Sequence, residues 1–176
     1  MFMSFILALV IVVGLAPASF AAGQQKRASA KAELKDRNGR PVGTVVLIDT
    51  PHGVLLHIDA SGLPPGEHGF HIHETGRCEP PDFKSAGGHF APAGRKHGFY
   101  SKQGHHAGDM ANLVVAEDGK AKAEIFVDRV QTAGGKSALL RPGGTAIVIH
   151  ANPDDYQTDP AGDAGDRIAC GVVERQ

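Results

Sequence analysis

Histidines are concentrated in one stretch of this 176-residue chain, where seven of the 10 lie between His68 and His106. His71 and His73 are separated by one residue, so on a β-strand both side chains would face the same side. Imidazole is a ligand for zinc and copper, and two imidazoles on one face can chelate a single ion. The first chemistry that the residues indicate is therefore metal binding.

Further candidate ligands follow along the chain. His89 comes directly after two glycines, which allow the backbone to bend close to a site. His106 stands three residues before Asp109, and His150 ends a separate apolar run. Six histidines and one carboxylate exceed what one tetrahedral ion needs, so the sequence predicts two metal ions. The predicted ligands are His71, His73, His89, His97, His106, Asp109 and His150.

Short strands and turns are expected to position these residues. The 23 glycines and 11 prolines favour strands and turns over a helical bundle. Eight runs have strand patterns, which predicts an all-β antiparallel sandwich or barrel. Two long loops, 75–110 and 151–167, have no sustained periodicity, and loops of this length are usually functional. The predicted strands are residues 30–34, 42–49, 54–59, 67–74, 112–116, 122–127, 145–150 and 168–173.

The N-terminal residues 1–21 are predicted to be a secretory signal peptide. An 11-residue apolar run, Phe5–Leu15, is followed by small residues, with cleavage expected after Ala18 or Ala21. Ala21 is preferred because Ser19 and Ala21 place small residues at the −3 and −1 positions. The run is shorter than the roughly 20 residues of a membrane span. Residues 22–29 are then a flexible lead-in to one domain, 30–176, in the periplasm or outside the cell.

Export and composition add two expectations. Two lone cysteines in an oxidising compartment most often form a disulfide, which would join Cys78 to Cys170. The net charge of −1 lacks the basic field typical of nucleic-acid binders, and tryptophan, useful for stacking on bases, is absent. We therefore expect no nucleic-acid partner.

Two motifs make a family resemblance specific. Residues 68–74, HGFHIHE, resemble a signature of copper,zinc superoxide dismutases, and so do residues 165–171, GDRIACG, near the C-terminus. The candidate ligands between them occur in the family's order, and the resemblance covers about residues 30–173. It implies an eight-stranded Greek-key β-sandwich or barrel with one copper and one zinc ion per subunit. It also implies superoxide as the substrate, and it leaves a homodimer open.

The resemblance also implies roles for individual residues. Copper would be held by His71, His73, His89 and His150. Zinc would be held by His89, His97, His106 and Asp109, with His89 bridging the two ions as an imidazolate. Asp154 would orient ligands by hydrogen bonding the far nitrogens of His71 and His97. Arg167 would face the copper channel and act in catalysis together with His89, and the Cys78–Cys170 pair matches the family's disulfide.

Two other functions are weighed against a dismutase. A non-enzymatic copper- and zinc-binding protein on the same fold would not need Arg167. A cupin-type metalloenzyme pairs an H-x-H motif with a following glutamate, which His73 and Glu79 nearly match. A cupin, however, needs neither the second ligand set nor the disulfide.

The histidines outside the predicted ligand set have other expected roles. His105 competes with His106 for zinc, and the spacing to Asp109 favours His106. His68 is expected to bond to backbone, and His52 and His57 to be ordinary surface or hydrogen-bonded histidines.

Loop 151–167 carries five aspartates, so attraction of the superoxide anion is expected from Arg167, the metals, or the lysines Lys84, Lys96 and Lys102.

Overall fold

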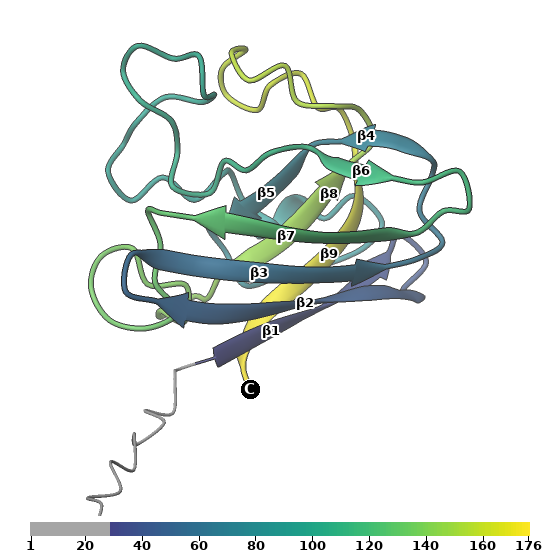
Figure 1. Ribbon diagram of the computed structural model, residues 1–176, viewed down its shortest axis with the longest axis horizontal. Coiled ribbons are helices and arrows are strands. Elements are labelled where there is room, and N and C mark those ends of the chain that lie inside the picture. The colour runs from purple at the N-terminus through teal and green to yellow at the C-terminus, as the bar shows by residue number, and fades with distance from the viewer. Residues whose placement is uncertain (1–28) are drawn as a thin grey trace, which may run out of the picture.

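The computed structural model describes residues 29–176 as a curled antiparallel sheet closed by a short second sheet (Figure 1). The predicted signal peptide and residues 22–28 of the lead-in lie outside the described residues. One 3-10 helix, η1 (Lys84–Ala86), occurs in this part of the chain, and no helix there is long and apolar enough to cross a membrane. The strands are β1 (Ser29–Asp36), β2 (Pro41–Thr50), β3 (Gly53–Ala60), β4 (Gly66–His68), β5 (Phe70–His73), β6 (Leu113–Val115), β7 (Ala121–Val127), β8 (Ala146–His150) and β9 (Arg167–Arg175).

The strand order confirms the predicted fold class. Seven strands form one sheet in the order β5-β8-β9-β1-β2-β3-β7, and β4 pairs with β6 in the second sheet. β3 and β7 are neighbours although three strands separate them in the sequence, as expected for Greek-key connections. β9 pairs with β1, so the two ends of the domain lie side by side. The result is an all-β barrel-like fold with the core inside the curled sheet.

Period-two patterns explain which faces enclose the core. Alternate residues of β1 are buried, and β3 buries Leu56 and Ile58 while Asp59 is exposed. By contrast, every residue of β5 and β8 is buried, histidines included. These two strands pair through Phe70–Ile149 and His73–Ala146. The ligand-bearing strands are therefore the fully enclosed ones.

The predicted strand 67–74 divides in two at Gly69, so residues 29–176 form nine strands rather than eight. The Gly69 amide donates to the Asn152 carbonyl at 2.8 Å, and the Gly69 carbonyl accepts from the His150 amide at 2.8 Å. A Cβ atom at position 69 would lie 2.7 Å from the Ala164 Cβ, which is too close. Because glycine allows this approach, pairing with β6 ends at β4 and pairing with β8 begins at β5, with only Gly69 between them. That crossing places β5 next to His150.

The two predicted loops rise at the same end of the sheet (Figure 1). Lys96 Nζ lies 2.8 Å from Asp159 Oδ2, and the Tyr100 amide donates to the Tyr156 carbonyl at 3.1 Å, so the loops support each other. A third long connection, 128–145, joins β7 to β8 and was not singled out from the sequence. Its Thr132 amide donates to Asp49 Oδ1 at 3.0 Å, which ties it to β2.

Candidate metal centre

Four buried histidines converge where β5 and β8 lie side by side. His71 and His73 come from β5, His150 ends β8, and His89 is paired with His73 through an isolated β-bridge. One ring nitrogen of each lies within 4.8 Å of the others. We call these four residues the strand-side group. The structure thus brings together the four residues that sequence reasoning expected around copper.

Hydrogen bonds decide which nitrogens of His73 and His150 face inward. Nδ1 of His73 donates to the Gly87 carbonyl at 3.0 Å, and Nδ1 of His150 donates to the Gly165 carbonyl at 3.1 Å. A neutral imidazole that donates through one nitrogen presents a lone pair at the other. The two Nε2 atoms lie 3.4 Å apart. Two lone pairs that face each other in this way are a fit for a shared cation.

The other two members of the group supply a sharper test of fit. His71 Nε2 donates to Asp154 Oδ2 at 2.8 Å, which leaves Nδ1 as the inward nitrogen. His71 Nδ1 and His89 Nε2 are buried and have no hydrogen-bond partner among residues 29–176. A buried polar atom without a partner costs about 1–3 kcal/mol. A metal ion at this point would satisfy both atoms.

Burial also sets the protonation of this group. Burial lowers the pKa of His71 to about 3, against the opposing effect of its hydrogen bond to Asp154. Burial likewise lowers the pKa of His150 to about 4. Both imidazoles are therefore neutral at neutral pH, which is the form that binds metal.

A second group surrounds the carboxylate of Asp109. The Nδ1 atoms of His89, His97 and His106 lie 2.9, 3.1 and 3.2 Å from Asp109 Oδ1. Four ligands held about 2.0–2.1 Å from a tetrahedral zinc ion are about 3.3 Å apart, close to these separations. We call these four residues the loop-side group, because all come from the segment between β5 and β6. His89 belongs to both groups and presents Nε2 to one and Nδ1 to the other.

Charge is concentrated in the loop-side group. Burial disfavours the charged forms, but the hydrogen bonds of His97 to Asp109 and Asp154 outweigh it and raise the pKa of His97 to about 9. Burial also opposes ionisation of Asp109, yet hydrogen bonds with His106, His89 and His97 hold its pKa far below the usual range. A buried carboxylate among three imidazoles is a donor set that suits zinc.

Asp154 connects the two groups. Its Oδ2 accepts from His71 Nε2 at 2.8 Å, and its Oδ1 accepts from His97 Nε2 at 3.0 Å. Burial opposes its ionisation, but these two hydrogen bonds keep the pKa of Asp154 below the usual range. Asn112 fixes the residue through two reciprocal bonds to its backbone, at 2.8 and 3.0 Å. One carboxylate therefore orients a ligand in each group.

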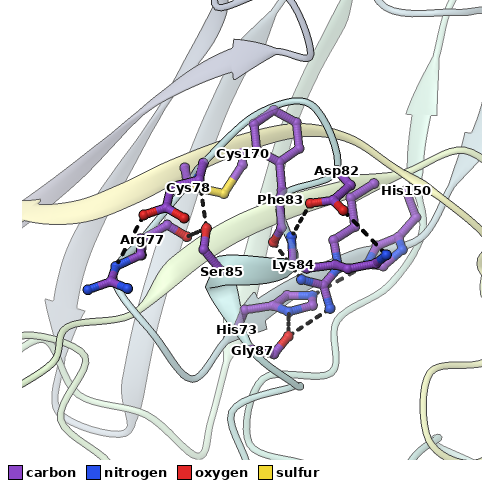
Figure 2. The surroundings of a disulfide bond; sticks show 12 residues. His73, Arg77, Cys78, Asp82, Phe83, Lys84, Ser85, Gly87, His150 and Cys170 are labelled. Atoms are coloured by element: carbon purple, nitrogen blue, oxygen red, sulfur yellow. Dashed lines mark hydrogen bonds and ion pairs between the residues drawn. A yellow bond between two sulfur atoms is a disulfide. The ribbon is translucent and has the colours of Figure 1, made fainter.

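The expected disulfide is present between Cys78 and Cys170 and joins the long first loop to β9 (Figure 2). Ser85 reinforces the same segment, since its hydroxyl accepts from the Glu79 amide at 2.8 Å and donates to the Arg77 carbonyl at 3.3 Å. The segment that follows Cys78 is thus held against the strand that carries Arg167.

That segment in turn fixes the guanidinium of Arg167. Nη1 donates to the Phe83 carbonyl at 2.6 Å, and Nη2 donates to the Gly87 carbonyl at 2.7 Å. The Gly87 carbonyl also accepts from His73 (Figure 2). Arg167 and the strand-side group therefore share one anchoring atom, which places a half-buried cation beside the four histidines.

Comparison with known proteins decides the family. Residues 42–173 match the family model described as copper/zinc superoxide dismutase. The chain belongs to this family. It is 51% identical over 146 residues to superoxide dismutase [Cu-Zn] 2 of Aquifex aeolicus (strain VF5), covering 82% of this chain and 85% of that protein. It is 47% identical over 149 residues to superoxide dismutase [Cu-Zn] of Caulobacter vibrioides, covering 83% and 86%. Among solved structures, a double mutant of a SOD-like protein from Bacillus subtilis has a TM-score of 0.79 and 43% identity, covering 81% of this chain and 95% of that one.

Membership of the copper/zinc superoxide dismutase family settles several sequence expectations. Copper and zinc are the family's metals, and both groups have donor sets that fit them. The cupin alternative fails, because Glu79 is an exposed residue that lies 3.7 Å from Arg77 and belongs to neither group. His105 also lies outside both groups, with its Nδ1 2.6 Å from the His106 carbonyl. The expectation for His68 is confirmed, since its two ring nitrogens lie 2.8 Å from the His150 and Pro64 carbonyls.

The candidate lysines differ in their surroundings. Lys96 is paired with Asp159 at 2.8 Å, so its charge is largely compensated. Lys84 lies 3.3 Å from Asp82 and lines the same pocket as Arg167 and Arg37. That pocket holds three cations against the carboxylates of Asp82 and Asp166, so it has a positive excess despite the acidic loop.

The sequence did not reveal the residues that hold the site in place without being ligands themselves. The Phe83 and Gly87 carbonyls carry no side-chain signal, so their contacts with Arg167 appear only in the structure. Gly162 had a weak signal as one of two glycines in the acidic loop 151–167. Its φ of +63° is left-handed, and a side chain there would overlap Asp154 Oδ1. Asn112, which fixes Asp154, had no recognisable motif.

Proposed function

We propose that this protein is an exported superoxide dismutase that converts two superoxide ions and two protons into dioxygen and hydrogen peroxide. The observation that carries the proposal is the strand-side group, with two buried nitrogens left without a partner within residues 29–176 and a fixed guanidinium beside them. A protein that only stores metal would need these nitrogens. It would have no use for the fixed Arg167 guanidinium, which lines a pocket with a positive excess of charge.

We assign copper to the strand-side group and zinc to the loop-side group. Four imidazoles suit copper, whereas three imidazoles with one carboxylate suit zinc. Copper, when bound, supplies the one-electron redox chemistry of the reaction. His89 belongs to both groups and would hold both ions, and two bound cations would favour loss of its second ring proton. Asp154 keeps His71 and His97 in the tautomers that present Nδ1 to the ions.

Arg167 binds the superoxide anion in this proposal. Its fork of donors is held by the Phe83 and Gly87 carbonyls, so little ordering is needed when the anion arrives. Lys84 and Arg37 line the same pocket but are paired with Asp82 and Asp166. The net positive charge that attracts the anion from solution therefore comes from Arg167. His89 would take up a proton at Nε2 while that nitrogen is not bound to the metal, and would pass it to the peroxide product, because that atom faces the strand-side group.

Export follows from the N-terminal sequence in this proposal. Cleavage after Ala21 removes residues 1–21 and leaves a mature chain that begins at Ala22. A disulfide that joins the first loop to β9 is consistent with an oxidising compartment. N-terminal sequencing of the protein recovered from the periplasm or the medium tests the cleavage site, and a mature N-terminus at Met1 would overturn export by this signal.

The decisive experiment compares two loadings of residues 22–176. We expect fast superoxide decay with copper and zinc together and only background decay with zinc alone. Background decay with both metals shown to be bound would leave a metal-binding protein on a dismutase fold. Arg167→Gln is expected to slow decay by about tenfold or more without loss of copper, since it removes the anion-binding group. Arg175→Gln, an exposed arginine on the same strand, serves as the matched control.

A further inference from the structure

A second pocket lies outside both metal groups. It has a volume of about 250 Å³ and lies where residues 91–107 of the first long loop meet Arg129 and Ser137 of the connection between β7 and β8. None of the residues of the strand-side or loop-side group lines it. The pocket is therefore distinct from the proposed reaction site and needs its own explanation.

The polar lining residues are two arginines, one serine and His105. Arg95 comes from the first loop and Arg129 from the residues that follow β7, and the Ser137 hydroxyl is beside them. No carboxylate lines the pocket. Within the part of the chain that the structure describes, neither guanidinium donates a hydrogen bond to another residue. The nearest acidic contact, Arg129 Nε to Asp128 Oδ1, is 3.8 Å and too long for one.

Apart from His105, the rest of the lining is apolar and small. Ala91, Pro92 and Ala107 supply methyl and ring surface, and Ala107 is buried. The volume lies below the range of about 300–1,000 Å³ typical of sites for drug-sized ligands. A site of this kind combines two forks of donors for an anionic group with a short apolar wall.

We propose that this pocket binds a small organic anion, namely a carboxylate attached to a short apolar body. The carboxylate lies between Arg95 and Arg129, because a guanidinium fork matches the geometry of its two oxygens. The apolar body lies against the alanines and proline of residues 91–107. The bound anion connects the loop that carries His97 and His106 to the connection after β7.

Calorimetric titration of the copper- and zinc-loaded protein tests this, with benzoate, acetate and inorganic phosphate as probes. We expect one saturable benzoate site, with acetate and phosphate each bound at least about tenfold more weakly. Arg95→Gln and Arg129→Gln are each expected to weaken benzoate binding by about tenfold or more, because each removes a charged hydrogen-bonding group. Arg175→Gln, an exposed arginine outside the pocket, is the matched control and leaves binding unchanged.

Three results would overturn the proposal. The first is no saturable benzoate binding. The second is phosphate binding as tight as that of benzoate, because charge alone would then explain the site. The third is a loss of benzoate binding in Arg167→Gln while Arg95→Gln and Arg129→Gln still bind it, because the anion would then lie beside the strand-side group. Thermal unfolding of each variant confirms that a loss of binding is not a loss of fold.

Discussion

The strand-side and loop-side groups share His89 but are positioned by different kinds of structure. Three of the four strand-side histidines stand on paired, fully buried strands. All four loop-side residues come from a segment that contains only η1 and isolated β-bridges. The sheet therefore holds most of the strand-side group in place before any ion binds, whereas the loop-side group depends on contacts within its own loop. We infer that zinc contributes more to local structure and copper more to chemistry.

The largest expected effect comes from removing a histidine of the strand-side group. His73→Ala removes one inward Nε2 and leaves the buried Nε2 of His150 facing empty space. We expect superoxide decay to fall to the rate without protein, with copper lost and zinc retained. Metal analysis beside the decay assay checks this. Equal loss of both metals would show that the two groups are not separable.

Breaking the loop-side group is expected to disturb structure as well as metal content. Asp109→Ala removes the carboxylate that faces three imidazoles. Zinc affinity should fall by more than the roughly 10- to 100-fold typical of losing an outer partner. Hydrogen exchange should speed up across residues 91–109, because local opening follows the loss of local contacts. If β5 and β8 lost protection to the same extent, the contrast between the groups would be wrong.

A change at the shared carboxylate sharpens the comparison. Asp154→Asn keeps the size of the side chain but weakens its bonds to His71 and His97. We expect zinc affinity to fall by about 10- to 100-fold and copper affinity to fall less. The reason is that β5 also holds His71, whereas no strand holds His97. Competition with chelators for each metal measures the two affinities, and a larger loss for copper would contradict the explanation.

The smallest effect is expected beside the loop-side group. His105 adjoins His106, but its ring packs on Phe99 with centroids 4.9 Å apart and does not reach the group. His105→Ala should change zinc affinity by less than about twofold, as for a substitution away from the site. The same chelator competition applies, with His106→Ala as the comparison. A drop similar to that of His106→Ala would place His105 among the ligands.

Much of this arrangement was predictable because it depends on side-chain type and period. The pattern of residues 145–150 predicted the strand observed at Ala146–His150, and period two placed His71 and His73 on one face. The division at Gly69 was not predicted, because the alternation of residues 70–73 gives no sign of it and only the Ala164 contact requires a glycine. The anchoring of Arg167 was also hidden, since backbone carbonyls have no residue signature. Nor could sequence show that His71 presents Nδ1 while His73 presents Nε2, because hydrogen bonds to Asp154 and Gly87 decide it.

The most direct test of this division of roles is anomalous diffraction from crystals of the copper- and zinc-loaded protein, recorded at the absorption edges of both metals. We predict copper at His71 Nδ1 and the Nε2 atoms of His73, His89 and His150. We predict zinc at Asp109 and the Nδ1 atoms of His89, His97 and His106. Copper in the loop-side group, mixed metals in both groups, or a His89 that contacts only one ion would contradict the account.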